Sequence, residues 1–538
     1  MSRLSTLLGQ RLRRDWLQLT LWIFGTLALA FAGLSGAANT YGTEQERTAL
    51  LATVMANPVI LLFRGLPSGP GEQAFIVFLL MPFLVMMPAF MSTFLAVRHT
   101  RGDEEAGRLE PVAATTAGRA VPTVATIVHG VLANVVLGVL VAAAFLAGGS
   151  PAEGSWLAGF TAACGGLTYL GVALLAAQLM RTSRGANSLA VWVLVVTYFI
   201  AGIGNALGTP SDDLTHMQSS WLTWLSPFGW AENTRAFDEN LWWPAFLCLA
   251  AFVVLAGVAL ALQTVRDLGA SIVPERRGRA AARATLSTPT ALVTRLATGS
   301  TIGWMAGAFF AGALSTSLGA VVNEMGSDNP AVADMLKALS AEADLEQAVI
   351  VVFFTMVGLL AACAGVQTVA RARQEEAHGT AEPVLATPVQ RVRWLADYVV
   401  VGFIAIVLTC AAAFVGAWAG AANLDNGALT GDAFVAAWGQ VIAASVFLVL
   451  TALVFAIAPR WTIPLGWTLV TAAIVFGLFG PLLGLPEWVT NLSPFSVAPV
   501  PSGSDVDLRG MWWLVLAVGV GAAASLTLMR RRELASAG

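Results

Sequence analysis

Two charged segments recur in a sequence that otherwise avoids charge. Residues 101–119 and 373–391 align without a gap, and 9 of their 19 positions are identical. Each contains the pattern Glu-x-x-Gly-x-x-Glu-Pro-Val, in which the glycine and the proline specify a short, bent helical element. Carboxylates and arginines at such fixed spacing suit ion-pair contact with another protein. We therefore expect a docking element in each copy, with these candidate contact residues: Glu104, Gly107, Glu110, Glu376, Gly379 and Glu382.

The sequence lacks the residue patterns expected of a nucleotide site or a metal site. A P-loop needs a lysine directly after glycine to reach the phosphates, whereas the only lysine, Lys337, stands between leucine and alanine. The four cysteines lie inside apolar stretches without ligand spacing, so we expect neither a disulfide framework nor a metal site. The chain is thus predicted to be no enzyme, to bind no cofactor itself and to have no catalytic residues.

The composition predicts a membrane protein. Of 538 residues, 57% are hydrophobic and only 11% are charged, less than half the charged share of an ordinary soluble domain. Apolar runs long enough to cross a bilayer predict an all-α polytopic fold with 12 transmembrane helices and no large domain outside the lipid bilayer. Nucleic acid is not an expected partner. The predicted spans cover residues 16–38, 73–96, 122–148, 155–180, 185–208, 242–263, 298–321, 347–369, 395–420, 432–458, 461–484 and 511–529.

The distribution of basic residues indicates how the chain is oriented in the membrane. When the loops are assigned alternately to the two sides, 24 of the 29 Lys and Arg residues fall on one side, which the positive-inside rule makes cytoplasmic. Both termini are then cytoplasmic. The first apolar run is too long for the core of a secretory signal, so we expect it to be retained as a span.

The recurrence extends to whole halves of the chain. The segment Trp221–Phe228 is echoed by Trp488–Phe495, each ends in Ser-Pro-Phe, and each is followed by a Trp-Trp pair that opens the last span of its half. Since six spans return the chain to the same side, the two halves are expected to be parallel repeats. We predict a first half over 1–265, a cytoplasmic linker with an amphipathic helix over 266–297, and a second half over 298–538.

The repeated segments, and above all Glu376 to Arg391 with its ending Ala-Thr-Pro-Val-Gln-Arg, resemble the cytoplasmic signature of ABC-2 type exporter permeases. In that family the segment between the second and third spans of a six-span unit docks on the ATP-binding subunit. The Ser-Pro-Phe segments resemble the family's outer hairpin before the sixth span. A fused chain of two halves is most similar to actinobacterial multidrug-efflux and tetronasin-resistance permeases.

That resemblance implies a pseudo-dimer of the type V exporter kind in the bacterial inner membrane. It implies two copies of an ABC ATP-binding subunit as partners, with ATP and Mg bound by those subunits, and the export of amphiphilic compounds such as drugs or antibiotics. Residues 1–15 have leucines on one face and arginines elsewhere, the pattern of a helix in the membrane interface and a second expected contact. The first half departs from the pattern at residues 116–118, which puts equal coupling by the halves in doubt.

Two stripes of side chains, one on the second span and one on the fifth, are candidates for lining the cargo cavity, because these spans flank the central cavity in that family. The alternative interpretation is ordinary helix packing, in which Asn and Tyr satisfy one another across helices. His129 and Asp397, the ionisable residues within spans, are expected to be a hydrogen-bonded interior residue and an interfacial one. The candidate cavity residues are Phe83, Met87, Phe90, Asn187, Tyr198 and Asn205.

Two other functions remain open from the sequence. A 12-span ion-coupled secondary transporter also has two parallel halves, but Arg101-Gly102-Asp103 only loosely echoes its loop motif, and a coupling charge within the spans is lacking. A membrane enzyme acting on lipid-linked sugars could use acidic residues of the outer segments, although no large outer loop is predicted. Those acids are Asp212, Asp213, Asp238 and Glu239.

Overall fold

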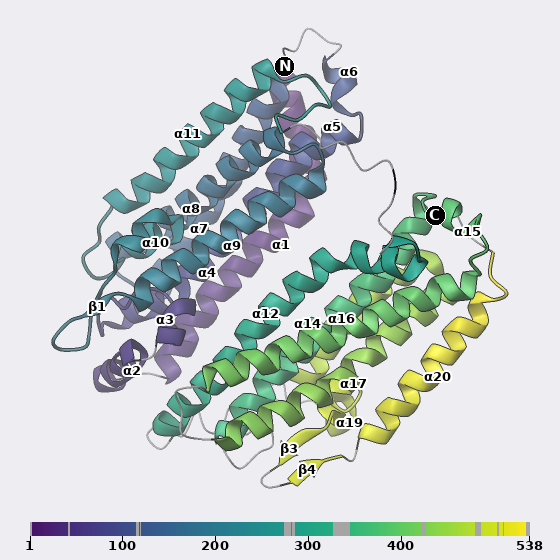
Figure 1. Cartoon of the computed structure of the whole chain (residues 1–538). Coiled ribbons are helices and arrows are strands. Elements are labelled where there is room, and N and C mark those ends of the chain that lie inside the picture. Colours follow the sequence, from purple (N-terminus) through teal and green to yellow (C-terminus); the bar gives the residue numbers. More distant parts are fainter. Residues whose placement is uncertain are drawn as a thin grey trace. The chain divides into compact units, whose positions relative to one another are not determined.

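The protein is almost entirely helical. The computed structural model describes residues 3–40, 43–56, 58–113, 118, 120–273, 281, 286–326, 345–421, 427–478, 486–502, 505–508 and 510–533. It divides into two compact units, unit 1 over Met1–Arg277 and unit 2 over Gly278–Gly538, each a bundle of long helices (Figure 1). The all-α polytopic fold predicted from the sequence is confirmed.

Six helices of membrane length build unit 1. They are α1 (Arg3–Thr40), α4 (Glu72–Val97), α7 (Val121–Ala147), α8 (Ala152–Leu179), α9 (Ser183–Ala206) and α11 (Trp243–Val265). The most deeply buried are α4 and α8, and α8 packs against α4, α7 and α11. Shorter elements connect them: α2 (Glu44–Ala56), α3 (Pro58–Phe63), η1 (Arg98–Gly102), α5 (Asp103–Glu105), α6 (Leu109–Ala113), β1 (Thr209–Pro210), β2 (Met217–Gln218), η2 (Trp221–Leu225) and α10 (Pro227–Glu232).

Unit 2 repeats this plan. Its long helices are α12 (Pro289–Gly326), α14 (Leu345–Ala377), α16 (Arg391–Gly420), α17 (Gly427–Ile457) and α20 (Met511–Met529). The central pair is again the second and the fourth span, α14 and α17. The remaining elements are η4 (Pro459–Trp461), α18 (Thr462–Ala473), η5 (Ile474–Leu478), α15 (Glu382–Leu385), α19 (Glu487–Thr490), η6 (Pro494–Val497), β3 (Val500–Ser502) and β4 (Asp505–Asp507).

Within the described residues, 11 helices are long and apolar enough to cross a membrane, and they match 11 of the 12 predicted spans. The predicted span 461–484 begins as α18 and η5, and its residues 479–485 lie outside the described part of the chain. Because nothing in the predicted interfacial stretch 1–15 breaks a helix, residues from Arg3 onward are the first turns of α1 itself. Their place in the membrane interface stays a prediction.

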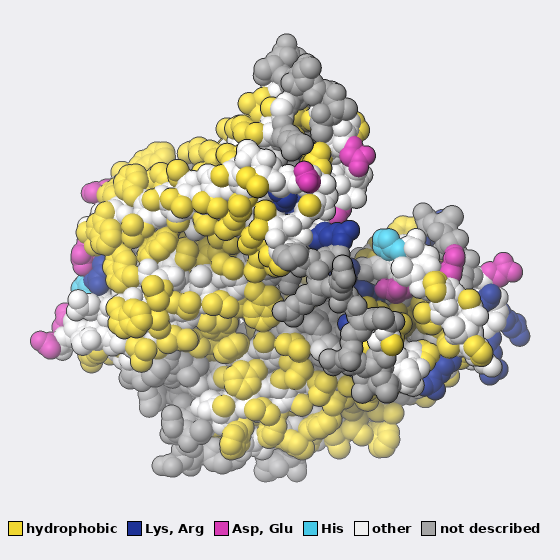
Figure 2. Space-filling model, turned by 45° about the horizontal axis from the view of Figure 1, so that its top comes forward, with side chains coloured by type: hydrophobic (Ala, Val, Ile, Leu, Met, Phe, Trp, Pro, Cys, Tyr) yellow, Lys and Arg dark blue, Asp and Glu magenta, His cyan; other side chains and the backbone are white. Residues whose placement is uncertain are grey.

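The sides of the bundles are apolar. Figure 2 shows hydrophobic side chains covering the helix flanks, with arginine and acidic side chains gathered towards the helix ends. Trp16, Phe24 and Val253 are more than half exposed, which in water would leave a very large apolar patch unfavourably hydrated. Tryptophans at the starts of the last spans, such as Trp243, Trp512 and Trp513, are exposed as well, as in an aromatic belt at a membrane interface. These surfaces fit a lipid bilayer.

Helix α4 contains two prolines, and at the first of them a neighbouring segment replaces the missing hydrogen bond. Pro82 has no N–H to donate to the carbonyl of Phe78, the residue one turn earlier. That carbonyl instead accepts a hydrogen bond from the backbone N–H of Gly65, at 3.1 Å. A side chain at position 65 would have its Cβ 2.7 Å from the same oxygen, so only glycine allows this approach.

Glycines also set the contact between α12 and α16. A Cβ at Gly416 would overlap the carbonyl oxygen of Phe309, and one at Gly312 would overlap that of Ala413. The hydroxyl of Thr316 donates to the carbonyl of Ala417 across the same contact, at 2.9 Å. Small residues that let two backbones approach are the usual means of packing helices within lipid.

We predict that Gly416→Ala lowers the stability of unit 2 by about 1–3 kcal/mol, because the added methyl group overfills a packed contact. The matched control is Gly303→Ala on α12, where a Cβ would meet nothing within 4 Å and alanine favours the helix. Thermal melting of the two variants in detergent measures the difference. Equal melting temperatures would contradict the close approach of α12 and α16.

Candidate functional site

In unit 1 the predicted docking segment lies where α4 ends, at the end of the bundle where α1 begins, here termed the α5 end (Figure 1). Helix α4 passes into the wider turns of η1 and then into α5, and the chain reverses at Gly107 before α6. Gly107 has φ +68°. The N–H of Arg108 donates to the carbonyl of Asp103 and the N–H of Gly107 to that of Glu104, the paired bonds of a glycine-terminated helix.

The corresponding turn of unit 2 has the same form. Gly379 has φ +71°, and its N–H donates to the carbonyl of Glu376, at 3.2 Å. In both units the glycine is needed for the backbone conformation and not for space, since a Cβ at either position would meet nothing within 4 Å. The repeated sequence pattern therefore forms the same turn in both units, as predicted.

Glu104 is buried in an ion-pair cluster, which we call the Glu104 clamp, composed of Arg101, Glu104 and Arg266. The two carboxylate oxygens of Glu104 accept from the two terminal nitrogens of Arg266 at 3.0 and 2.9 Å. Arg101 lies 3.0 Å from the same carboxylate. The Glu104 side chain is only 7% exposed, so its charge is satisfied inside unit 1 and is not presented to a partner.

The clamp also closes the end of α8. Arg101, which is 1% exposed, donates from Nε and Nη2 to the carbonyl of Ala177 at 2.9 and 2.6 Å. The last carbonyls of a helix lack partners within it and carry its negative dipole end. Backbone N–H groups of Ile272 and Val273 donate to the next two carbonyls, those of Gln178 and Leu179. Spans two, four and six of unit 1 are thereby tied together at the α5 end.

Unit 2 has an equivalent cluster, the Glu376 clamp, composed of Arg373, Glu376 and Arg532. The carboxylate of Glu376, 2% exposed, pairs with Arg532 and lies 3.6 Å from Arg373. Arg532 donates to the carbonyl of Phe455 near the end of α17 at 2.8 Å and stacks over its ring. Here the arginine that follows the last span caps the fourth span.

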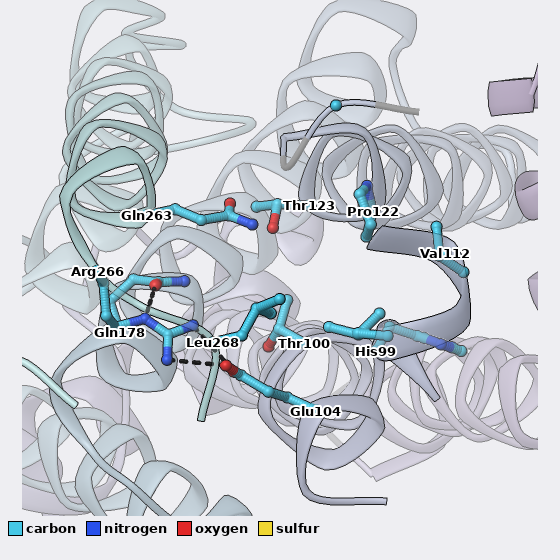
Figure 3. A pocket seen from close by; sticks show the side chains of 12 residues that line it. His99, Thr100, Glu104, Val112, Pro122, Thr123, Gln178, Gln263, Arg266 and Leu268 are labelled. Atoms are coloured by element: carbon cyan, nitrogen blue, oxygen red, sulfur yellow. Dashed lines mark hydrogen bonds and ion pairs between the residues drawn. The ribbon is translucent and has the colours of Figure 1, made fainter. Parts of the chain in front are cut away.

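Glu110 and Glu382 are placed differently from the clamped glutamates. Both side chains are exposed, at the starts of α6 and α15. A cavity separates α6 from the clamp in unit 1 (Figure 3): Glu104 and Arg266 meet on one side of it, and Val112 of α6 lies across from them. Of the six predicted docking residues, these two carboxylates are therefore the ones that face outward.

The predicted cargo residues fall into two groups. Phe83, Met87 and Phe90 lie along the half-buried face of α4, where Met87 packs near Gly25 of α1 and Phe90 stacks on Phe94. The residues of α9 are engaged internally at the opposite end of the bundle, the α10 end: the hydroxyl of Tyr198 donates to the carbonyl of Phe63 and the amide of Asn205 to Glu232. Asn187 lies half-buried near the start of α9. Their part in binding cargo stays a prediction.

The two Ser-Pro-Phe segments play the same structural role in both units. The hydroxyls of Ser226 and Ser493 donate to backbone carbonyls of the fifth spans, those of Thr197 and Ala473. The phenylalanines that follow are buried, and each packs against an aromatic ring of the fourth span. These segments anchor the fifth and fourth spans to each other at the α10 end.

Sequence reasoning missed the arginines of the clamps. Arg266 and Arg532 count there only among the basic residues that set the orientation, although each stands shortly after the last span of its unit. Asp397, expected to be interfacial, pairs with Arg393 on the preceding turn at 3.2 Å and accepts from Thr290 of α12. His129 is interior as expected, yet neither of its ring nitrogens has a hydrogen-bond partner among the described residues.

Comparison with known proteins agrees with this architecture. Residues 286–530 match the family described as multidrug efflux system permease Rv1217c, C-terminal domain. The whole chain is 31% identical over 520 residues to the multidrug efflux system permease protein Rv1217c of Mycobacterium tuberculosis (strain ATCC 25618 / H37Rv), covering 95% of this chain and 91% of that protein. The chain belongs to this family of multidrug efflux permeases. It is thus a multi-pass membrane transport protein.

One buried carboxylate of the permease stands apart from the clamps. Glu232 ends α10, outside the 11 candidate spans. It is 7% exposed, and the Nδ2 of Asn205 donates to it at 2.6 Å. Burial raises the pKa of Glu232 to about 8, although the bond from Asn205 opposes this. The group is therefore mainly protonated at neutral pH.

We predict that Glu104→Gln lowers the stability of the permease by about 3–5 kcal/mol, because two buried arginines lose their counter-charge. Amide hydrogen exchange should accelerate at residues 266–273, which the clamp holds against α8. Glu110→Gln, on the exposed side of the same turn, is the matched control and should leave exchange there unchanged. Unaltered exchange in the Glu104 variant would show that the clamp does not hold this segment.

A second prediction concerns the pH dependence of stability. The ordinary pKa of a glutamate is 4.5, so between about 4.5 and 8 the unfolded chain has lost a proton that folded Glu232 retains, and stability falls as pH rises. Glu232→Gln removes this dependence. It should melt close to the wild type at pH 5 and above it at pH 8. A constant difference in melting temperature across that range would contradict the assignment.

Proposed function

We propose that this permease is the membrane subunit of an ATP-driven ABC exporter, which receives mechanical work at the α5 and α15 turns. The two clamps carry the proposal. In each unit a buried glutamate fixes the turn after the second span to the arginine that follows the sixth, and leaves a second glutamate exposed three positions beyond the glycine. A force on the exposed side would therefore reach several spans together.

The partner would be a separate ATP-binding subunit in two copies, one for each turn. The sequence has a single lysine and no P-loop, so ATP and Mg would be bound by those subunits. By the positive-inside rule the α5 and α15 ends, with both termini, would face the cytoplasm. The exporter we propose would lie in the bacterial inner membrane. ATP would then be supplied on the side where the exposed glutamates lie.

The side chains on the half-buried face of α4 indicate the class of cargo. The half-buried face of α4 is lined by aromatic rings and methionine, which suit flexible apolar contact. The curated relative is named a multidrug efflux permease. Amphiphilic compounds moved outward from the inner leaflet or the cytoplasm are the cargo that agrees with both observations.

Ion-coupled transport is the second candidate, and Glu232 favours it. A buried carboxyl group with a pKa of about 8 can release and regain a proton near neutral pH. Its position at the α10 end, in contact with the predicted cargo residue Asn205, is compatible with such a role. Export that continues in vesicles with a proton gradient and no ATP would favour this candidate.

The decisive test reverses the exposed charges. Glu110→Lys together with Glu382→Lys should weaken binding of the ATP-binding subunit about 100-fold, because like charges across an interface cost several kcal/mol. ATP-dependent export of a fluorescent amphiphile such as ethidium from inverted vesicles should be lost. Protein amount and melting temperature should stay unchanged, because both side chains are exposed.

The matched control reverses two exposed acids at the opposite end of unit 1, Glu153→Lys with Asp212→Lys, and should keep both binding and export. ATP-driven export retained by the Glu110 and Glu382 variant would overturn the proposed coupling route. Export that fails in the control as well would indicate a general effect of charge and not docking at these turns.

A further inference from the structure

Unit 1 contains a cluster of ligand-type side chains that the transport argument does not use. Asp15 of α1, His99 of η1 and His129 of α7 each offer one oxygen or nitrogen atom, and the three atoms lie within 4.8 Å of one another. Their side chains are 3%, 0% and 0% exposed. Three different helices thus direct groups that can bind a metal ion to one buried point.

His129 makes this cluster unusual. Both of its ring nitrogens are buried without a hydrogen-bond partner among the described residues, and its ring lies 5.5 Å from that of His99. Leaving a buried polar group unsatisfied costs free energy comparable to a lost hydrogen bond. A metal ion bound to one of these nitrogens would remove that cost.

The surrounding groups are those of an outer coordination shell. His99 faces Asp15 through Nε2, while its Nδ1 lies 3.5 Å from Asp103. The other oxygen of Asp15 lies 3.0 Å from Arg98. In metal sites the second ring nitrogen of a histidine ligand usually contacts a carboxylate, and carboxylate ligands are themselves hydrogen-bonded. Asp103 and Arg98 stand at these two places as charge partners, although neither the Nδ1 of His99 nor the Oδ1 of Asp15 has a hydrogen bond among the described residues.

The charges and the ligand types around the cluster indicate which kind of metal ion it would bind. Besides Arg98, Arg11 donates to the carbonyl of His99, and Arg14 and Arg108 pair with Asp103. Four arginines against two carboxylates oppose any divalent cation, and most of all hard ions such as Mg²⁺ or Ca²⁺, which bind through charge and need many oxygen ligands. Two imidazoles and one carboxylate suit Zn²⁺ or a similar divalent transition ion, which binds nitrogen strongly.

Two cavities at the α5 end reach the cluster at His99. They measure about 40 and 160 Å³, and neither is lined by Asp15 or His129. A zinc ion with three protein ligands takes a water as its fourth. Metal–nitrogen bonds near 2.0 Å place the ligand atoms about 3.3 Å apart, so His129 would draw closer, whereas the hydrogen-bonded Nε2 of His99 and carboxylate of Asp15 would separate.

We propose that Asp15, His99 and His129 form a binding site for a divalent transition metal ion that ties α1, α4 and α7 together beside α5. The site belongs to unit 1 alone. In the register of the repeat, His99 and His129 correspond to Arg371 and Val401, and Arg371 pairs with Glu375 instead. This proposal rests on the cluster and not on the proposed exporter function.

The test uses the full-length permease in detergent, purified with a tag that contains no histidine and stripped with EDTA. Titration with Co²⁺ should give visible absorption bands of a nitrogen- and oxygen-ligated ion that saturate at one equivalent per chain, and Zn²⁺ should displace them. Zn²⁺ should also raise the melting temperature of the wild type. An absence of saturable binding overturns the proposal.

Variants assign the site. His129→Gln should abolish the cobalt bands and the thermal shift, and Asp103→Asn, which removes the outer-shell carboxylate, should weaken binding about 10–100-fold. His216→Gln and His378→Gln replace the other two histidines and should bind like the wild type. Full binding by the His129 variant, or its loss in the His216 variant, would place the ion elsewhere and overturn the assignment.

Discussion

A charged side chain buried away from water needs a partner of opposite charge. In the two clamps of this permease, buried glutamates and arginines pair with one another. Arg101 is among its largest fully buried side chains, and Glu104 holds it together with Arg266. Because removal of one partner of a buried ion pair costs several kcal/mol, the turn after the second span cannot move independently of the segment after the sixth. The turn at Gly107 is therefore tied to the helix bundle at that end.

Much of the fold could be predicted because it depends on local properties. Apolar runs of bilayer length predicted 11 spans to within a few residues, except that α1 and α12 begin earlier and α14 ends later than hydropathy alone indicates. The turns at Gly107 and Gly379 were also predictable, since a residue pattern specifies a left-handed glycine locally. These features need no knowledge of what lies opposite in space.

The contacts within the candidate site could be predicted only in part, because they join residues that are far apart in the sequence. Glu104 and Arg266 are 162 residues apart, and nothing in the spacing of either reveals the other. Two glutamates of one motif therefore looked alike in the sequence, although one is buried in a clamp and the other is exposed. His129 was singled out as an interior residue, but its meeting with Asp15 and His99 could not be predicted for the same reason, since each stands alone among apolar or basic neighbours.

The order of the clamp residues along the chain has a consequence for biosynthesis. In both units the glutamate precedes the arginine that follows the last span, by 162 residues in unit 1 and by 156 in unit 2. While the ribosome is adding the third to sixth spans, each glutamate has only the arginine three positions before it as a clamp partner. Each clamp is therefore complete only when the sixth span of its unit has been inserted.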